Sequence, residues 1–173
     1  VLGTYSVPAA IGKLEKFCVD YVRKNLGGYP KPELPPPLGT RVGVVGSGPA
    51  GLAVAEELVK RGHSVTVFEV WPRPGGLLIY GIPGFKLNKE IVWEKLRWLE
   101  ELGIEFRCNT RIGKDVTVDE LLRKHGFDAV FLGHGASAGN RMKIPGEELK
   151  NVYNATEYLV KGNLPDELLP DNM

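Results

Sequence analysis

The sequence has 173 residues, of which 43% are hydrophobic and 25% are charged, as expected for one ordinary globular domain. Its 22 basic and 21 acidic residues are mixed along the chain and give a formal net charge of +1. No block of positive charge can follow a nucleic-acid backbone or an anionic membrane surface, so neither is an expected partner.

The sequence also argues against a membrane protein, a secreted protein and a metal site. Its apolar runs are shorter than the roughly 18 residues of a membrane span, and no secretory signal pattern begins the chain. We therefore predict a cytoplasmic protein. The two cysteines, Cys18 and Cys108, form no CxxC pair, and the three histidines are scattered without metal-ligand spacing. We predict no metal ligand in this chain.

The first predicted element is an amphipathic helix that starts near Ser6 and Pro8 and ends at Gly27 and Gly28. Residues 29–38 then contain five prolines, which remove backbone donors and favour an extended linker. The predicted division is residues 1–38 for the helix and linker, and residues 39–173 for a second domain.

Strands alternate with helices in the remainder of the chain. A parallel sheet covered by helices on both faces gives this alternation, so the predicted class is α/β. Asn88 and the Thr117–Glu120 pair are expected helix caps, and a glycine-rich and proline-rich loop is expected over 75–84. The strands are predicted at 41–45, 64–69, 104–108 and 128–132, and the helices at 52–61, 88–102, 117–126 and 154–161.

The pattern that carries chemistry is GSGPAG at Gly46–Gly51, between a hydrophobic strand and a helix. Gly46 permits a tight turn, Gly48 leaves room for a pyrophosphate beside the backbone, and Gly51 lets the helix pack closely on the strand. Pro49 suits a first helical position, and the free N–H groups of that helix end attract phosphate. The alternative is a turn that only needs flexible backbone.

Glu69 ends the second predicted strand 18 positions after Gly51 (69 − 51). An acid at about this offset accepts the ribose hydroxyls of an adenosine and would repel a 2′-phosphate, which predicts FAD or NAD rather than NADP. The alternative is a solvated charge at a strand end. These residues do not choose between FAD and NAD.

The choice comes from a resemblance. Together with Gly46–Leu52 and Glu69, the run GGLLIYGIP at residues 75–83 resembles the small subunit of glutamate synthase and its relatives, the large subunit of NADH-dependent ferredoxin:NADP oxidoreductase and the amino-terminal half of dihydropyrimidine dehydrogenase. The segments at 7–15 and 144–148 extend the resemblance over almost the whole chain. It implies a Rossmann-like FAD-binding domain preceded by a helix.

The resemblance also implies the cofactor-contacting residues. The glycine turn would hold the FAD pyrophosphate, Glu69 the ribose, and the residues after the glycine doublet the flavin. The implied FAD-binding residues are Gly46, Ser47, Gly48, Pro49, Ala50, Gly51, Glu69, Gly75, Gly76, Leu77, Leu78, Gly81, Ile82, Val116, Gly133 and Gly135.

Several of these positions have simpler interpretations. Residues 75–84 would otherwise be a surface turn, and Val116, implied to meet adenine through its backbone, would be ordinary core. Arg73 would reach the cofactor or remain a solvated loop cation. The GHGASA run at 133–138 follows a strand, but no helical pattern comes after it, so we expect another loop beside the same FAD and not a second nucleotide site. His134 is not expected to be a catalytic base.

Complete members of the family pass electrons from NAD(P)H through FAD and iron-sulfur clusters to an acceptor. The present sequence looks truncated by comparison, because it contains neither cluster cysteines nor a second fingerprint for NAD(P)H. We therefore expect a portion of an oxidoreductase that is inactive alone and contains no catalytic side chain. It is expected to bind FAD only and to associate with a large subunit or another electron-acceptor protein. The alternatives are a non-catalytic nucleotide-binding or assembly module of an electron-transfer complex, and an NAD-dependent dehydrogenase.

Overall fold

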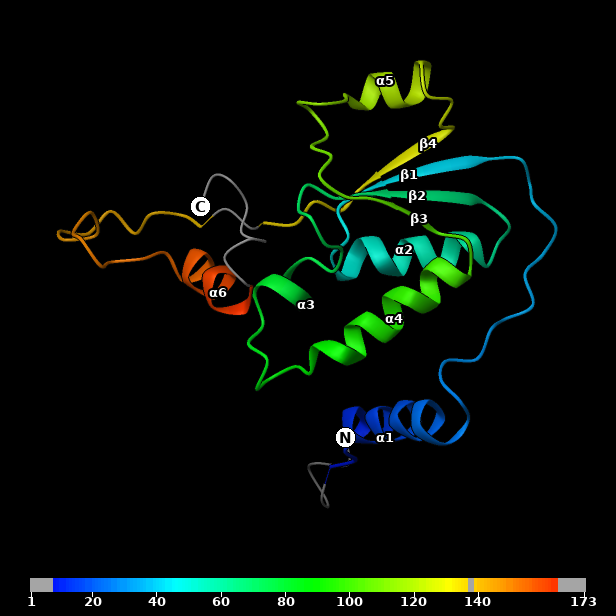
Figure 1. Ribbon diagram of the computed structural model, residues 1–173, viewed down its shortest axis with the longest axis horizontal. Coiled ribbons are helices and arrows are strands. Elements are labelled where there is room, and N and C mark those ends of the chain that lie inside the picture. The colour runs from blue at the N-terminus through cyan, green and yellow to red at the C-terminus, as the bar shows by residue number, and fades with distance from the viewer. Residues whose placement is uncertain (1–7, 137–138, 165–173) are drawn as a thin grey trace. The chain divides into compact units, whose positions relative to one another are not determined.

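The computed structural model describes residues 8–136 and 139–164 (Figure 1). The chain divides into two compact units, with the division between Pro32 and Glu33. The predicted division at residue 38, which separates a helix and linker from an FAD-binding domain, stays a prediction. The two units are described separately below.

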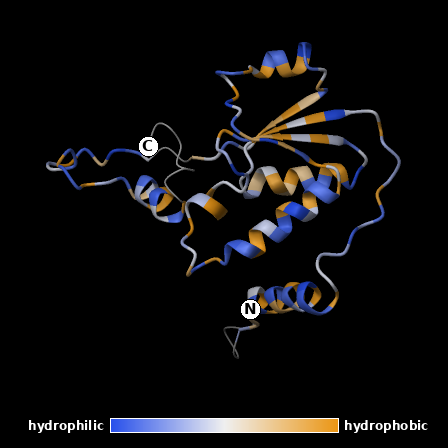
Figure 2. Ribbon diagram, viewed as in Figure 1, coloured by the Kyte–Doolittle hydropathy of each residue, from blue (hydrophilic) through white to orange (hydrophobic). Residues whose placement is uncertain are grey.

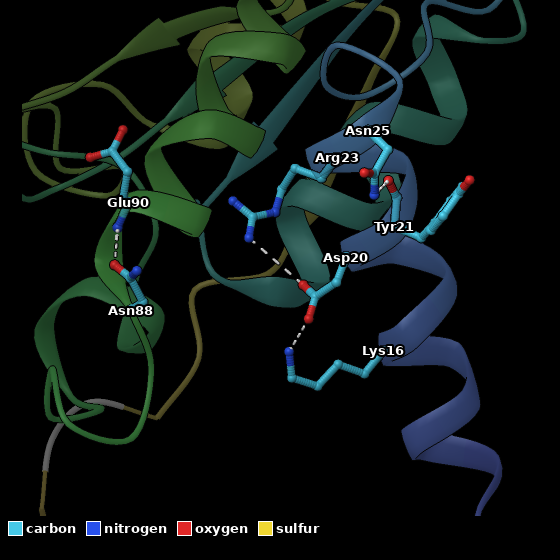
Figure 3. A network of polar contacts seen from close by, with 7 residues as sticks. All are labelled: Lys16, Asp20, Tyr21, Arg23, Asn25, Asn88 and Glu90. Carbon is cyan, nitrogen blue, oxygen red and sulfur yellow. Dashed lines mark hydrogen bonds and ion pairs between the residues drawn. The ribbon is translucent and has the colours of Figure 1, made fainter.

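The first unit contains the helix α1, Ile11–Asn25. It begins after Ala10, later than predicted, and Ser6 lies outside the described residues. Its end agrees with the prediction, since Gly27 and Gly28 have φ values of 81° and 109°. Figure 3 shows polar pairs along this helix, in which the ammonium of Lys16 and the guanidinium of Arg23 both face Asp20.

The second unit contains one four-stranded sheet in the order β3-β2-β1-β4. The strands are β1 (Arg41–Val45), β2 (Ser64–Phe68), β3 (Glu105–Arg107) and β4 (Ala129–Leu132), and all three pairings are parallel. The predicted α/β class and the four predicted strand positions are therefore confirmed. Because β1 lies between β2 and β4, residues that follow these three strands meet at one edge of the sheet.

Helices cover both faces of this sheet, as predicted. In Figure 1, α2 and α4 lie on one side and α5 lies on the other. The strand β4 is hydrophobic along its length, whereas β3 has one hydrophobic residue between two charged ones, and α4 carries alternating hydrophobic and hydrophilic residues (Figure 2). The helices of this unit are α2 (Pro49–Val59), α3 (Leu77–Tyr80), α4 (Lys89–Glu101), α5 (Val118–Arg123) and α6 (Ala155–Asn163).

The predicted helix caps are present. The Asn88 side chain accepts a hydrogen bond from the Glu90 amide at the start of α4 (Figure 3), and Thr117 with Glu120 forms a complete capping box on α5. One element was not predicted: the loop expected over 75–84 contains the single-turn helix α3. The glycines and prolines of this segment indicated a loop, and a single helical turn is too short to show a helical period in the sequence.

The hydrophobic core is built from different residues on the two faces of the sheet. Val44 and Val67 are fully buried, with α2 packed against β1 and β2. On the α5 side, Phe68 meets Phe127 edge to face at 5.6 Å between ring centroids, and both pack with Leu121. Among the described helices, none has the length and apolar character needed to cross a membrane.

Candidate dinucleotide-binding site

The glycine turn, Gly46–Gly51, leaves β1 in a conformation that requires Gly46. Its φ is +94°, and a Cβ atom there would lie 2.5 Å from the Gly133 carbonyl oxygen. The Gly46 amide donates to the Phe68 carbonyl oxygen at 2.8 Å, which carries the sheet one residue beyond the strands. The tight turn predicted for this glycine is confirmed.

Gly51 is required by the packing of α2 on the turn. A Cβ atom at this position would lie 1.9 Å from the Gly46 carbonyl oxygen and 3.2 Å from Val44 Cγ1. The close approach of helix and strand predicted from the sequence is therefore real. Both outer glycines of the fingerprint are explained by contacts within the protein.

Gly48 differs from these two glycines. It is the residue before α2, with φ −69° and ψ 179°, which any residue can adopt, and no atom of the described residues lies within 4 Å of the position where its Cβ would stand. Nothing in the fold accounts for glycine here, so the open space beside it is where a phosphate can reach the backbone. Pro49 and Ala50 are exposed at the start of α2, and the amides of such a first turn have no partners within the helix.

Glu69 is not a solvated strand-end charge, because only 5% of it is exposed. Its carboxylate accepts from the Ser47 amide at 3.0 Å, from the Ser47 hydroxyl, and from the Trp71 amide at 3.0 Å. The carboxylate thus joins the end of β2 to the glycine turn. Whether it also meets a ribose stays a prediction.

Ser47 has a larger structural role than the fingerprint predicted. It is fully buried, and its hydroxyl oxygen accepts a hydrogen bond from the Gly75 amide at 2.9 Å while donating to Glu69. One side chain therefore connects three segments that are distant in sequence. The sequence offered no signal for this, since a serine between two glycines usually reads as part of the loop.

The glycine doublet, Gly75–Gly76, packs directly on the glycine turn. The φ values are +123° and +51°, and a Cβ on Gly76 would lie 2.8 Å from Gly48 Cα. The surface-turn interpretation of this segment is therefore wrong for the doublet, which is held against the first motif. The fold brings together the two segments that the sequence singled out.

The leucine turn, Leu77–Ile82, follows the doublet and includes α3. Leu77 is exposed, whereas Leu78 and Ile82 are partly buried. A Cβ on Gly81 would lie 2.6 Å from Leu77 Cδ2, the end of an exposed side chain that can turn aside, and the φ of Gly81 is −102°, so the contacts within the chain do not require glycine here. Contact of these residues with a flavin stays a prediction.

Tyr80 anchors the leucine turn and was not predicted as a site residue. Its hydroxyl accepts from the Arg73 amide at 2.9 Å and donates to the Arg73 carbonyl oxygen at 3.0 Å, and its ring lies 3.9 Å from the Trp71 ring between centroids. Burial raises the pKa of Tyr80 to about 12, so the hydroxyl stays a donor at neutral pH. The Arg73 guanidinium lies over the Trp93 ring at 5.5 Å, which places it in a cation–π contact.

The remaining predicted residues fall into two groups. Gly133 touches the glycine turn, since a Cβ on it would lie 3.4 Å from the Gly51 amide nitrogen, whereas Gly135 and His134 are exposed. No helix lies in residues 139–146, as expected. Val116 packs against the core cluster that contains Phe68, and its carbonyl oxygen accepts from the Gly113 amide at 2.7 Å, so it has the core contacts of the alternative interpretation.

Other features of the described residues lie outside this site. A cavity of about 910 Å³ is lined by residues between 139 and 157, none of them a predicted site residue. Cys18 and Cys108 are free, and burial raises the pKa of Cys108 to about 11. Over residues 8–136 and 139–164, no three histidine, cysteine or acidic residues gather as metal ligands would.

Replacing Ser47 with alanine tests the connection between the three segments. The variant leaves the buried Gly75 amide without its partner and removes one of the two hydrogen bonds to Glu69 Oε2, which keeps the Ser47 amide, so we expect a loss of about 1–3 kcal/mol in the free energy of unfolding. Urea unfolding followed by circular dichroism measures this loss. Ser64→Ala, at the exposed start of β2, is the control, and equal midpoints for the two variants would contradict a structural role for Ser47.

The comparisons with known proteins agree with the predicted resemblance. The family of NAD(P)-binding Rossmann-like domains matches residues 44–88. The small chain of NADPH glutamate synthase from Bacillus subtilis is 46% identical over 151 residues, which cover 87% of this chain and 30% of the relative. The NADH glutamate synthase of Saccharomyces cerevisiae is 44% identical over 160 residues, covering 91% of this chain and 7% of the relative.

Solved structures show the same fold. FprA from Mycobacterium tuberculosis in complex with NADPH superimposes with a TM-score of 0.62 and 27% sequence identity, covering 69% of this chain and 28% of that one. 2-Naphthoyl-CoA reductase gives a TM-score of 0.61 with 28% identity over 77% of this chain and 20% of the reductase. The chain spans about 30% of the length of the small chain from Bacillus subtilis.

Proposed function

The chain is related to the glutamate synthase small chains over most of its length, and on that basis we propose that it is the FAD-binding portion of an NAD(P)H-dependent oxidoreductase. The whole enzyme would carry electrons from NAD(P)H through FAD to iron-sulfur clusters. This chain would supply the cradle for FAD, with its large subunit or another electron acceptor as partner. A cytoplasmic location stays a prediction from the sequence.

The open space at Gly48 carries this proposal. The fold itself explains Gly46 and Gly51, but within residues 8–136 and 139–164 no atom lies within 4 Å of a Gly48 Cβ, so these residues fit a group that approaches from outside the chain. A pyrophosphate at this place would meet the free amides and the positive end of α2. The buried carboxylate of Glu69, fixed beside the same turn, fits an adenosine without a 2′-phosphate.

The contact between the glycine doublet and the glycine turn supports FAD over NAD. A flavin dinucleotide extends beyond its pyrophosphate to a wide planar ring. Gly76 lies so close to Gly48 that an added Cβ would stand 2.8 Å from Gly48 Cα, and the leucine turn follows directly after Gly76. When bound, FAD accepts hydride and releases single electrons, and the protein positions it. In this proposal the glycine turn binds the diphosphate, Glu69 orients the ribose, and the leucine turn lines the flavin.

The second candidate is a non-catalytic module that binds a nucleotide and docks to a larger electron-transfer complex. Two observations support this second candidate. The matched family is one of NAD(P)-binding domains, and this chain covers only a small share of each relative. This second function requires that the chain bind a nucleotide without taking part in flavin-dependent electron transfer.

Titration of the purified protein with FAD, NAD and NADP separates these functions. We expect FAD to bind with a dissociation constant in the micromolar range or below, which corresponds to about 8 kcal/mol, and to acquire a resolved visible spectrum. Calorimetry and absorbance measure both. Binding of NAD without FAD would favour the dehydrogenase or the module, and absence of any dinucleotide binding would contradict the proposal.

A further inference from the structure

Lys89 lies outside the predicted site but reaches into the leucine turn. It is the first residue of α4, and its ammonium donates to the Leu78 carbonyl oxygen at 2.8 Å and to the Ile82 carbonyl oxygen. The two carbonyls lie 11 and 7 residues before it in the sequence. Lys89 therefore spans the segment between the turn and the helix that follows.

The leucine turn needs such an external tie. A helix of four residues has too few internal hydrogen bonds to be stable by itself, and its last carbonyls have no partners further along the helix. The turn is closed by the Ile82 amide, which donates to the Leu77 carbonyl oxygen at 2.9 Å. Lys89 then binds the carbonyl oxygens of two residues of this closed segment, Leu78 and Ile82.

The other ties of the turn hold different parts of it. Ser47 holds Gly75, the Tyr80 hydroxyl holds the main chain of Arg73, and the Asn163 side-chain amide donates to the Tyr80 carbonyl oxygen at 3.0 Å. None of these three contacts reaches Leu78 or Ile82, whereas Lys89 binds the carbonyl oxygens of both. These two residues and Gly81, which lies between the tied carbonyls, are predicted to line the flavin.

Placing an ammonium here has a cost, which argues that the contact is specific. Lys89 is partly buried, and burial lowers the pKa of its ammonium below the ordinary value for lysine. Lys86, in the loop just before α4, is exposed, as loop lysines usually are. The chain thus buries one of two neighbouring lysines against backbone carbonyls.

We propose that Lys89 is a positioning residue for the flavin, which fixes the main chain of the leucine turn by binding the Leu78 and Ile82 carbonyls. The proposal rests on the proposed FAD-binding function. Lys89 acts through the backbone and needs no direct contact with the cofactor. Its loss would let the turn shift and change both the affinity for FAD and the surroundings of the flavin ring.

The test compares Lys89→Met with Lys89→Arg and Lys86→Met in the purified protein. Lys89→Met is expected to weaken FAD binding about tenfold, because two charge-assisted hydrogen bonds are lost, and to shift the flavin absorbance bands and flavin fluorescence. Lys89→Arg keeps a cationic donor and should recover most of the affinity and the wild-type spectrum. Lys86→Met should match the wild type in both.

The outcomes distinguish this inference from the proposed function. If the wild-type protein binds FAD and Lys89→Met retains the same affinity and spectrum, the inference is wrong and the function stands. If the wild-type protein binds no FAD, both are overturned. Should Lys89→Met fail to fold, Lys89→Gln serves instead: its neutral amide reaches fewer carbonyls, so a loss of about threefold and a changed spectrum support the inference, and wild-type values refute it.

Discussion

Gly48→Val is expected to abolish FAD binding and to leave the fold nearly intact. The position has room for a side chain, because in the part of the chain that the structure describes no atom lies within 4 Å of the Cβ site, and its backbone conformation is open to any residue. A branched side chain there would fill the space beside the first amides of α2. We expect the dissociation constant for FAD to rise at least about 100-fold, equivalent to about 3 kcal/mol.

The measurement is an FAD titration paired with thermal unfolding of the unliganded protein. Valine before a helix is a poorer cap than glycine, so a loss of up to about 1 kcal/mol in the free energy of unfolding is expected from the cap alone and does not indicate a changed fold. Gly84→Val is the control, because Gly84 is an exposed loop glycine that also has no atom within 4 Å of its Cβ site. Unchanged FAD binding by Gly48→Val would remove the observation on which the proposed function depends.

Gly51→Ala should have the opposite profile, with the fold itself lost or strongly weakened. The added Cβ would stand 1.9 Å from the Gly46 carbonyl oxygen, a main-chain atom that cannot turn aside as a side chain could. The helix must move away from β1, which also opens the packing against Val44. We expect a loss of about 3 kcal/mol in the free energy of unfolding, at the upper end for overpacking a core.

Denaturant unfolding of unliganded protein measures this loss without involving the cofactor. The matched control is Gly162→Ala in α6, where nothing lies within 4 Å of the added Cβ and alanine favours the helix by up to about 1 kcal/mol. One glycine replacement is thus expected to destabilise the protein and the other to stabilise it. A Gly51→Ala protein as stable as the wild type would mean that α2 and β1 pack less closely than described.

The sequence was sufficient for the sheet and for the caps of its helices because these depend on local patterns. β1 and β2 are rich in valine and buried over most of their length, as strands of a parallel sheet are, and Asn88 and Thr117 have side chains that satisfy a helix start. The mechanical roles of Gly46 and Gly51 were also predicted correctly. Each follows from the spacing of glycines between a strand and a helix.

What the sequence could not provide was the set of contacts between distant segments. The Gly75 amide bonds to Ser47, which is 28 positions away, and Lys89 bonds to carbonyls whose placement depends on a single helical turn. Neither contact leaves a periodic pattern. The burial of Glu69 was missed for the same reason, since a carboxylate next to a strand end is usually exposed unless other parts of the chain supply donors.

The hydrogen bonds that Glu69 receives within the chain have a consequence for the order of folding and ligand capture. A buried acid without donors would make the unliganded state costly, and the protein would then need its cofactor in order to fold. Here Ser47 and Trp71, which belong to the chain itself, supply those donors. Under the proposed function, the dinucleotide would therefore not be needed to satisfy this buried acid, and its binding would spend little energy on ordering the Glu69 side of the site.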